Sequence, residues 1–593
     1  MTNNPKTANP SAKKTKQKNV QSADQTSSSQ TQNLNSYFNY SYDYNIKRIT
    51  KQYLDSLSLD DDALNNIKPD EMTSELYIQT INMIRKRNHY IQNNYGKGHN
   101  WKEPLNLENI QIADCIALKE EIVLISQSGN HHQSTNDLLA VYQTKGYNKG
   151  IYDSDPQIID RLIQMYRPTC SDKDSKNIIK LLTMKVKRVQ KTTDPDLIPL
   201  NNGIFNYKEQ TLQPFSSNYY FLSKSHVDFV DNPENPILTN QDGSLWNVHD
   251  WFNSLSDDEG VPDLLWQVTG AVLRPNVHWN QAVFLYSSEG RNGKGTLCDL
   301  WRNLLGSGSY MTLPLNQMSN QFALEPIVNV NNIITDENDV GSYLDKAANL
   351  KALITGDPIT IDRKFKQPIT YEFTGLIIEC LNDVPQIKDK SDSLYRRQLF
   401  IPMNKSFKNN ENKDIKEKYL KEPSVLEYVL WYALTQLPMY YEFSQPPAVQ
   451  QALEQYKQEN DPVEQFLATI LPACQWDGLP FNFLYALYQK WYQINIPGGH
   501  RLSNSTFKRA LKDKFRNGQV LYHFRLPNNS RAQFKTGNKL NKPEPLIEQY
   551  KLVDWLNPRT TNEQERLRPA NLADRYDGLV RADNQNKVIN LNN

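Results

Sequence analysis

The chain has 593 residues, too many for one hydrophobic core, and a prior of about 100 to 200 residues per domain predicts about three to five units. Its 67 Lys and Arg residues balance 66 Asp and Glu residues, so overall charge neither requires nor excludes a nucleic-acid partner. The five cysteines lie far apart, which excludes a disulfide scaffold and the paired spacing of a zinc site, and we expect a reducing, cytoplasmic setting.

Residues 1–35 are expected to form a disordered tail. They consist mainly of Lys, Asn, Gln, Ser and Thr and cannot bury enough apolar surface to offset chain entropy. No stretch of the sequence reaches the roughly 18 apolar residues that a membrane span requires. We therefore expect no membrane partner.

Residues 36–240 are predicted to form an N-terminal α+β domain. The segment MTSELYIQTINMIRKRN has helical spacing, and CIALKEEIVLIS contains short strand-like runs. This part of the sequence lacks the pair of acids on an apolar strand that a two-metal primase site needs. His131 and His132 have no third ligand nearby, which favours a loop over a metal site.

The remaining sequence suggests an α/β domain between two linkers, followed by a basic domain. Strand-like runs AVFLYS, NNIITDE and TGLIIECLN alternate with helical or irregular connections, as in an α/β sheet. The predicted fold class is therefore α/β and multidomain. The expected boundaries are 241–275 for a helical collar or linker, 276–445 for the α/β domain, 446–460 for a linker, 461–545 for the basic domain and 546–593 for a mobile C-terminal tail.

The segment FLYSSEGRNGKGTLC, residues 284–298, has the pattern of a phosphate-binding loop. A strand, a glycine-bearing turn and a helix start direct backbone N–H groups at one concavity, and Lys294 adds a mobile positive charge. The pattern G-x-x-x-x-G-K-[ST] is matched imperfectly, since Ser288 takes the first Gly position and Gly295 follows the lysine, so the hydroxyl comes one place late. An ordinary glycine turn is the competing interpretation. The expected nucleotide contacts are Ser288, Glu289, Gly290, Arg291, Asn292, Gly293, Lys294, Gly295 and Thr296.

Polar residues that such a loop needs for nucleotide hydrolysis follow later strands. Asp336 and Glu337 end the apolar run NNIIT, where one carboxylate can serve hydrated Mg²⁺ and the other can polarise water. Asn382 ends the run TGLIIECL and suits orientation of that water. Arg396 and Arg397 precede LFIPM, where a guanidinium could serve the site of a neighbouring subunit. Each of these segments is ambiguous by itself, and the Asp336-Glu337 pair could be an ordinary solvated turn. The order and spacing of the segments favour a nucleotide-hydrolysing site.

These segments resemble a known family. SSEGRNGKGT, IITDEN, LKALITGDPITIDRKFKQP, IIECLNDVP and YRRQLFIPM together resemble the superfamily 3 helicases of the phage, plasmid and poxvirus primase-helicase branch. LIPLNNGIFNYKEQTLQPF upstream and PPAVQQALEQYKQENDPVEQFL downstream are similar to flanking segments of that branch, so the resemblance covers about residues 195–545. More narrowly, the chain resembles the replication initiator-helicases of staphylococcal mobile islands and cassettes.

The resemblance implies an AAA+ ATPase that uses ATP and Mg²⁺, assembles as a ring, commonly a hexamer, and moves 3′ to 5′ on single-stranded DNA. It implies that Lys294 and Thr296 belong to Walker A and Asp336 and Glu337 to Walker B, with Thr296 and Asp336 as metal ligands. Asn382 corresponds to sensor 1, and Arg396 or Arg397 to the arginine finger. Lys351 stands where the family often has a basic residue that reaches a neighbour's nucleotide.

Two basic segments are candidate DNA contacts. ITIDRKFKQPITYEF is predicted to form a hairpin with Lys364, Phe365 and Lys366 at its tip, which in the family points into the ring channel. The basic domain resembles a winged helix in outline, with a helix over LSNSTFKRALKDKFRNGQ and two wing strands, VLYHFRLP and AQFKTG. Exposed basic surfaces without DNA are the alternative for both. The DNA-binding candidates in this domain are Lys508, Arg509, Lys512 and Arg531, with Lys514 and Arg516 on the same helix.

The sequence thus predicts an ATP-dependent replicative DNA helicase and replication initiator of a mobile genetic element. Its expected partners are single-stranded DNA, duplex origin DNA, further copies of itself and replication proteins of the host or element. Two alternatives stay open: a primase-helicase that makes primers through residues 36–240, and a DNA-binding initiator in which ATP binding only controls assembly.

Overall fold

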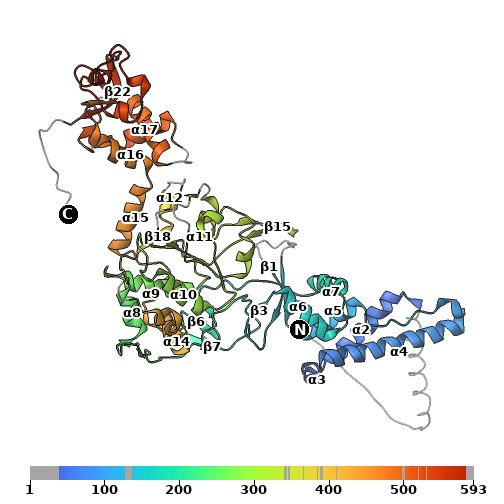
Figure 1. Cartoon of the computed structure of the whole chain (residues 1–593). Coiled ribbons are helices and arrows are strands. Elements are labelled where there is room, and N and C mark those ends of the chain that lie inside the picture. The colour runs from blue at the N-terminus through green and yellow to red at the C-terminus, as the bar shows by residue number, and fades with distance from the viewer. Residues whose placement is uncertain are drawn as a thin grey trace, which may run out of the picture. The chain divides into compact units, whose positions relative to one another are not determined.

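The structure is a computed structural model that describes residues 39–126, 137–338, 343–344, 347–364, 366–382, 385–387, 392–408, 411–496, 501–518, 520–528 and 531–582. The chain divides into two compact units, residues 1–229 with 365–371 and residues 230–364 with 372–593 (Figure 1). The mixed α/β, multidomain fold class is confirmed. His131, His132 and Phe365 lie outside the described residues.

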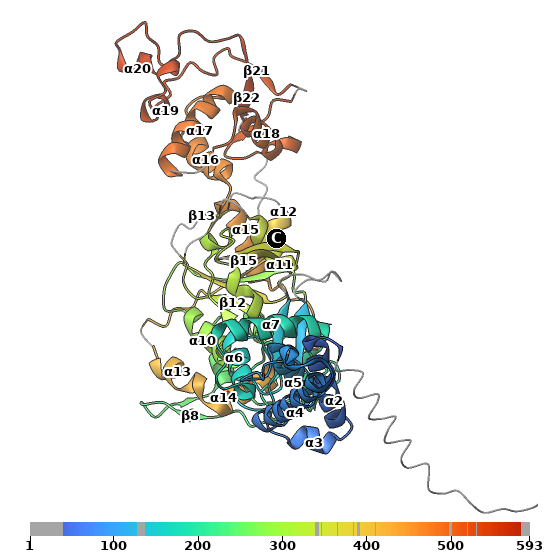
Figure 2. The same cartoon turned by 90° about the vertical axis from the view of Figure 1, so that its right-hand side faces the viewer.

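The N-terminal unit combines a helical layer with a small mixed sheet. Strand β1 pairs antiparallel with β2 and parallel with β4, in the order β3-β2-β1-β4. Helices α2 and α4 lie side by side (Figures 1 and 2). The elements are α2 (Tyr42–Ser58), α3 (Asp61–Asn66), α4 (Pro69–Tyr95), α5 (Asn109–Lys119), β1 (Ile122–Ser126), β2 (Leu138–Tyr142), β3 (Tyr152–Asp153), α6 (Pro156–Tyr166), α7 (Asp172–Lys185) and β4 (Arg188–Gln190).

A buried polar side chain joins three helices of this unit. The side-chain amide of Gln111 on α5, fully buried, donates to Thr50 of α2 at 3.0 Å and to Thr80 of α4 at 3.1 Å, so a buried polar group is satisfied by both neighbouring helices.

A separate antiparallel meander follows, formed by β5 (Leu197–Pro199), β6 (Ile204–Asn206) and β7 (Thr211–Gln213). It contains the segment LIPLNNGIFNYKEQTLQPF that carries part of the family resemblance.

The second unit is built on a five-stranded parallel sheet in the order β11-β12-β16-β10-β18. All residues of β12, β16 and β18 are buried, which explains why these strands read as continuous apolar runs rather than alternating ones. The strands are β10 (Ala282–Tyr286), β11 (Tyr310–Met311), β12 (Asn332–Thr335), β16 (Leu376–Leu381) and β18 (Gln398–Pro402).

The segment 241–275, predicted as a helical collar or linker, contains helices α8 (Val248–Ser254) and α9 (Val261–Val272), which pack into the α/β part. Phe252 of α8 stacks on Trp266 of α9 with ring centroids 3.8 Å apart, and both side chains are buried. Trp301 of α10 (Lys294–Leu305) donates its indole N–H to Thr269 at 2.9 Å. These helices are integral to the α/β core because their apolar surface is covered by it. Strands β8 (Leu238–Thr239) and β9 (Leu245–Trp246) precede them as an antiparallel pair.

The predicted linker over 446–460 is wrong, because the structure has helix α15 (Pro447–Glu459) packed against β18. Tyr456 stacks on Phe400 of β18 at 4.4 Å between ring centroids, and its hydroxyl donates to the carbonyl of Pro385 at 3.3 Å. The segment QQALEQYKQEN is mostly polar, so its amphipathic helix was not recognised from the sequence. The apolar side of this helix packs on β18 of the sheet.

Shorter elements complete the α/β part. Strands β14 (Ile359–Arg363) and β15 (Lys366–Tyr371) pair in a two-stranded sheet, so the predicted basic hairpin has its two strands, with Lys364 in the turn. Strands β13 (Tyr343–Leu344) and β17 (Gln386–Ile387) pair in parallel. The remaining helices are α11 (Ala348–Thr355), α12 (Asp392–Tyr395), α13 (Lys413–Glu417) and α14 (Pro423–Trp431).

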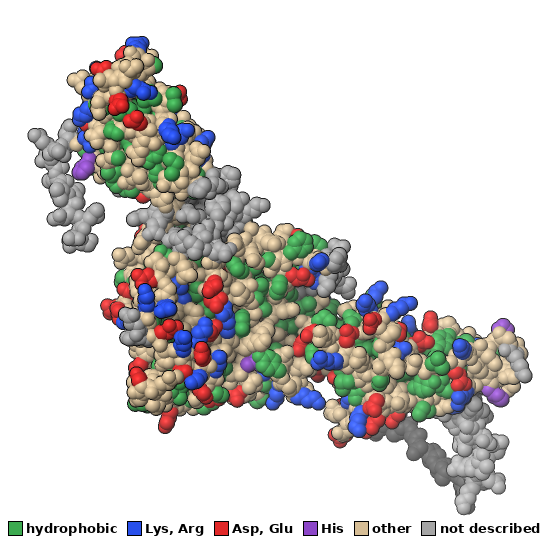
Figure 3. Space-filling view, in the orientation of Figure 1, with side chains coloured by type: hydrophobic (Ala, Val, Ile, Leu, Met, Phe, Trp, Pro, Cys, Tyr) green, Lys and Arg blue, Asp and Glu red, His purple; other side chains and the backbone are tan. Residues whose placement is uncertain are grey.

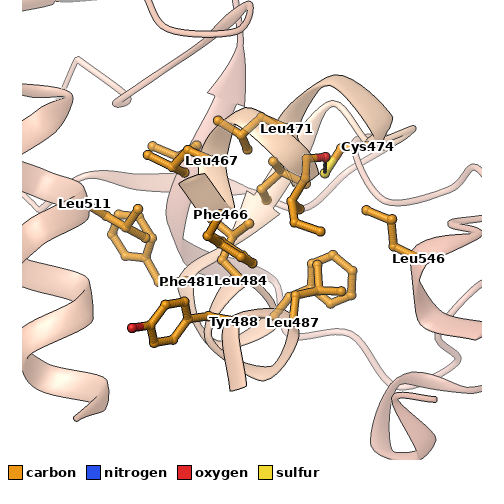
Figure 4. Close-up of a cluster of buried hydrophobic side chains, with 14 of the residues drawn as sticks. Phe466, Leu467, Leu471, Cys474, Phe481, Leu484, Leu487, Tyr488, Leu511 and Leu546 are labelled. Carbon is orange, nitrogen blue, oxygen red and sulfur yellow. Dashed lines mark hydrogen bonds between the residues drawn. The ribbon is translucent and has the colours of Figure 1, made fainter. Parts of the chain in front are cut away.

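The C-terminal part surrounds an aromatic core. Figure 4 shows Phe466 of α16, Tyr488 of α17 and Leu511 of α18 converging on one cluster. Ring stacking between Tyr488 and Phe507, 4.5 Å between centroids, joins α17 to α18. The elements are α16 (Pro462–Ile470), β19 (Gly478–Pro480), α17 (Phe481–Asn495), α18 (Asn504–Lys514), β20 (Phe524–Arg525), β21 (Gln533–Lys535), α19 (Leu546–Gln549), α20 (Glu563–Arg566) and β22 (Arg575–Arg581).

Strand β22 corrects the prediction of a mobile tail from residue 546. It pairs antiparallel with β19, β20 and β21, and Leu546, Ile547 and Leu579 are buried in the aromatic core. The wing is also different from the expected hairpin, because β20 and β21 each pair with β22. A strand from the predicted tail supplies the central partner for both.

No described helix is long and apolar enough to cross a membrane. On the face shown in Figure 3, acidic and basic side chains are intermixed.

Candidate nucleotide-binding site

The loop between β10 and α10 is held in a fixed turn by its own side chains. The Asn292 amide, buried, donates to the carbonyl of Glu289 at 2.6 Å. Gly293, the residue that caps α10, has φ +85°, and a Cβ there would lie 2.7 Å from Leu255. Glycine is therefore required at this position by both conformation and space. The turn opens the first N–H groups of a twelve-residue helix toward the end of the sheet, the arrangement that binds anions.

Lys294 begins α10 and lies inside this turn. It is only 6% exposed, and its ammonium donates to the carbonyl of Ser287 at 3.3 Å. Burial lowers its pKa from the ordinary value. Among the residues that the structure describes, no carboxylate forms an ion pair with this buried ammonium, so a phosphate group at the turn would supply a favourable opposite charge.

The loop, Asn382 and the two predicted carboxylates follow the carboxyl ends of neighbouring strands of the sheet. The amide of Ser287, just after β10, donates to Leu381 at the end of β16 at 3.1 Å, and Asn382 follows directly. Asp336 and Glu337 follow β12, which is paired with the other side of β16. Strands are about 4.8 Å apart, so the loop after β10 and the carboxylates after β12 are separated by about 10 Å, with Asn382 between them. Carboxyl ends of parallel strands are where such folds bind ligands.

An ion-pair network connects Asp336 to the helix after the loop. Arg302 of α10 donates to Asp336 at 3.1 Å and to Asp299 at 3.2 Å, and its other terminal nitrogen donates to the carbonyl of Ile334 at 3.1 Å. Lys416 of α13 lies 3.0 Å from the second oxygen of Asp299. The hydrogen bond from Arg302 holds the pKa of Asp336 below its ordinary value, so this carboxylate is ionised at neutral pH.

The donors present fit a magnesium ion that arrives with a nucleotide. Thr296, in the first turn of α10, offers a hydroxyl, and Asp336 offers an ionised carboxylate. Mg²⁺ bound with substrate phosphates usually takes only one or two protein oxygens and keeps several waters. Within the described ranges, no group of three or more His, Cys, Asp or Glu side chains could hold a metal by itself. Glu337, in contrast to Asp336, is exposed at the edge.

Arg396 and Arg397 lie at the opposite end of the strands, where β10 and β18 begin. They precede β18, and the carbonyl of Arg397 accepts the amide of Ala282, the first residue of β10. At roughly 3.3 Å per residue, the length of β10 separates them from the loop by about 15 Å. Arg397 donates to the carbonyl of Ser393, whereas the Arg396 side chain is exposed. The structure therefore distinguishes two residues that the sequence left equal.

The other predicted contacts lie elsewhere. Lys351 is half-buried on α11, and Lys364 is exposed in the β14–β15 turn. On α18, Arg509 is exposed, while the Lys512 ammonium lies 5.7 Å from the ring of Phe481. Lys508 is half-buried on the same helix, and Arg531 is exposed just before β21.

Lys514 is excluded from the basic surface of α18. Its ammonium lies 2.8 Å from both Asp461 and Glu464, so its charge is already balanced within the domain.

Several residues near the site were missed from the sequence. Glu379, in the middle of β16, is fully buried and contacts Thr335 and Asn338. Arg302 and Lys416 were also missed. Glu379 could have been noticed from the sequence, because it is an acidic residue inside the apolar run LIIECL. A buried acid in a central strand needs specific hydrogen-bond partners.

Comparisons with known proteins place three segments of the chain. Residues 75–251 match the family described as "D5 N terminal like", and residues 458–557 match "Poxvirus D5 protein-like". Two separate segments of the chain are therefore similar to models of D5-like proteins. Residues 285–397, which contain the loop, both carboxylates and the two arginines, match "Family of unknown function (DUF5906)". The two D5-like matches agree with the poxvirus part of the predicted resemblance, and the staphylococcal branch stays a prediction.

Solved structures show weaker likeness. The apo structure of the NrS-1 C-terminal region (305–718) has 14% sequence identity and a TM-score of 0.39, with 70% of this chain and 96% of that chain covered. A JCV helicase structure has 14% identity and a TM-score of 0.23, with 36% and 58% covered. TM-scores this low do not establish a shared overall fold.

Proposed function

We propose that this protein is an ATP-dependent DNA helicase that initiates and drives replication of a mobile genetic element. The observation that carries the proposal is the edge of the parallel sheet, where the turn with buried Lys294, the neutral Asn382 and the carboxylates of Asp336 and Glu337 occur in that spatial order. A triphosphate needs each of these groups for binding and hydrolysis. The two D5-like matches support the same assignment.

In this proposal the loop binds ATP through its backbone amides and Lys294. The ammonium, which now contacts only the carbonyl of Ser287 among the contacts described, would contact the β and γ phosphates. Bound Mg²⁺ would neutralise charge on the phosphates, with Thr296 and Asp336 as its protein ligands. Glu337 would accept a hydrogen bond from the attacking water, and Asn382 would orient it.

The arginine that stabilises the transition state would come from another copy of the chain. Arg396 lies at the far edge of the sheet from its own loop and cannot reach it, whereas a head-to-tail neighbour could present it there. Repetition of that contact gives a ring, and we propose the hexamer of the family. Lys351 would reach a neighbour's nucleotide in the same way.

DNA contacts would come from two places. Lys364 and Lys366 of the β14–β15 hairpin would bind backbone phosphates of single-stranded DNA, with Phe365 against a base or sugar, and nucleotide-driven movement of the interface would carry the strand 3′ to 5′. The C-terminal domain, a winged helix in this proposal, would bind duplex origin DNA through α18. Its contacts would be Lys508, Arg509, Lys512 and Arg531.

Substitution of Lys294 tests the proposal directly. In Lys294→Ala the loss of the buried ammonium should lower ATP turnover and strand displacement on forked DNA by about 100-fold or more, because a charge that binds the transferred phosphoryl group is removed. Lys421→Ala removes an exposed lysine of the same unit and should leave both rates unchanged. Wild-type ATP turnover without strand displacement would favour an ATP-regulated initiator. Primer synthesis from ribonucleotides would favour a primase-helicase.

A further inference from the structure

The buried acid Glu379 lies at a junction between the parts of the candidate site. It is in the central strand β16, opposite Thr335 of β12 in register, and none of its surface is exposed. Its two oxygens have different partners: Asn338 donates to one at 2.8 Å, and the Thr335 hydroxyl lies 3.3 Å from the other. Both partners flank the carboxylates Asp336 and Glu337 in sequence.

Asn338 is fixed by the same network. Its amide nitrogen also donates to the carbonyl of Cys380 at 3.1 Å, and its oxygen accepts the amide of Leu315 at 2.9 Å. The Thr335 hydroxyl accepts the amide of Leu313 at 3.2 Å. Three chain segments, after β11, after β12 and within β16, are therefore held by bonds that converge on one carboxyl group.

We infer that Glu379 is a positioning residue for ATP hydrolysis, which holds the Asp336–Glu337 turn in place through Asn338 and Thr335. The inference rests on the proposed function, since it concerns the placement of groups that would act on ATP. Glu379 is fully buried in β16, and Asn382 follows the end of that strand three residues later, so Glu379 links the carboxylate turn to the strand that leads to the residue proposed to orient water. A shift of about 1 Å in such groups can reduce turnover about 100-fold.

Burial favours the protonated, neutral form of the Glu379 carboxyl group. Burial raises the pKa of Glu379 well above its ordinary value, and the hydrogen bonds from Asn338 and Thr335 offset this only in part. Asn338 and the Thr335 hydroxyl both donate to the Glu379 carboxyl group, and a hydroxyl can also turn to accept the proton of a neutral acid. Glutamine has the same shape with one donor and one acceptor, so Glu379→Gln should preserve the network, and Glu379→Ala should break it.

The test separates turnover from nucleotide affinity. Glu379→Ala should lower kcat for ATP about 10- to 100-fold with the Kd for a non-hydrolysable ATP analogue within about threefold, and Glu379→Gln should stay within about threefold of wild type in both. Asn338→Ala, at a partly exposed site, should give the same selective loss of kcat. Glu544→Ala removes another fully buried acid, one that accepts amides of Gln475 and Trp476, and controls for general destabilisation.

Each outcome decides the matter. A normal kcat in folded Glu379→Ala, or a loss that Glu544→Ala shares, overturns the positioning role, and a Gln variant as slow as the Ala variant overturns the neutral acid. If the wild-type protein hydrolyses no ATP, the proposed function fails separately, and hydrogen exchange then tests the network alone. The amides of Leu313 and Leu315 should exchange faster in Glu379→Ala than in wild type, and equal exchange rates would contradict it.

Discussion

Some residues of the candidate site could be predicted from the sequence, and others could not. Lys294 and Gly293 belong to one contiguous loop, so local pattern was sufficient to predict a turn of this kind. Arg302, Asn338 and Glu379 act through partners that are 34 to 44 residues away in the chain. A single sequence contains no signal for such pairings, because they arise only when the fold brings β12 beside β16 and α10 beside the end of β12.

Glu337 is expected to govern hydrolysis rather than binding. Its side chain is exposed, whereas Asp336 accepts a hydrogen bond from Arg302, so the two adjacent carboxylates have different surroundings. Glu337→Gln removes the charge that would polarise water and should lower kcat about 100-fold or more with ATP affinity within about threefold. Single-turnover hydrolysis and equilibrium binding measure the two effects. A kcat within twofold of wild type would assign the role to another group.

The buried acid also predicts a pH dependence of stability. The pKa of Glu379 is raised on folding from an ordinary value of 4.5, so the folded state keeps a proton that the unfolded chain releases. Its contribution to stability is therefore complete below about pH 4.5 and declines as pH rises toward the folded pKa, by up to about 1.4 kcal/mol per unit. Glu379→Gln has no such proton, so its free energy of unfolding relative to wild type should increase from pH 5 to 7 in urea titrations. A difference that is constant with pH would show that Glu379 is ionised in the folded protein.

At the scale of elements, strands with buried apolar runs were predictable and a mixed strand was not. AVFLYS, NNIITDE and TGLIIECLN correspond to β10, β12 and β16. The sequence RYDGLVR of β22 has little apolar content and only Gly578 and Leu579 are buried, so it resembled a tail. A Cβ at Gly578 would lie 2.1 Å from the carbonyl of Leu479, which shows how closely β22 packs on β19. Helix α15 was missed for a similar reason, since its buried side is a narrow stripe among polar residues.

The β14–β15 hairpin carries a prediction about DNA. Lys364→Ala combined with Lys366→Ala should leave basal ATP turnover within about twofold and reduce its stimulation by single-stranded DNA. Two lost phosphate contacts should also reduce the slope of log affinity against log salt by about 1.4. Lys208→Ala with Lys421→Ala removes the same charge from exposed positions outside the hairpin and serves as the control. A double hairpin variant with an unchanged DNA response and salt slope would remove the hairpin from the DNA path.

At the scale of the whole molecule, the matches to family models fall on three separate stretches, 75–251, 285–397 and 458–557. The middle stretch alone contains the loop, the carboxylates and the arginines. The loop and the carboxylates lie at the carboxyl ends of the strands, and the arginines lie at the opposite end of the same sheet. One copy of the chain therefore lacks a guanidinium at its own site among the sequence-predicted groups. In the proposed function, a second copy of the chain would supply this guanidinium.

Mixing of two inactive variants tests this proposal. Lys294→Ala and Arg396→Ala should each lose ATP turnover alone, because one lacks the phosphate-binding ammonium and the other the neighbour's guanidinium. In an equal mixture of randomly assembled rings, about one interface in four combines an intact lysine with an intact arginine, so up to about a quarter of wild-type turnover should return. Arg397→Ala should lose less activity than Arg396→Ala, since Arg397 donates to Ser393 of its own chain. Mixtures that stay inactive at every ratio, after exchange of subunits is shown by mass, would mean that Arg396 does not act across an interface.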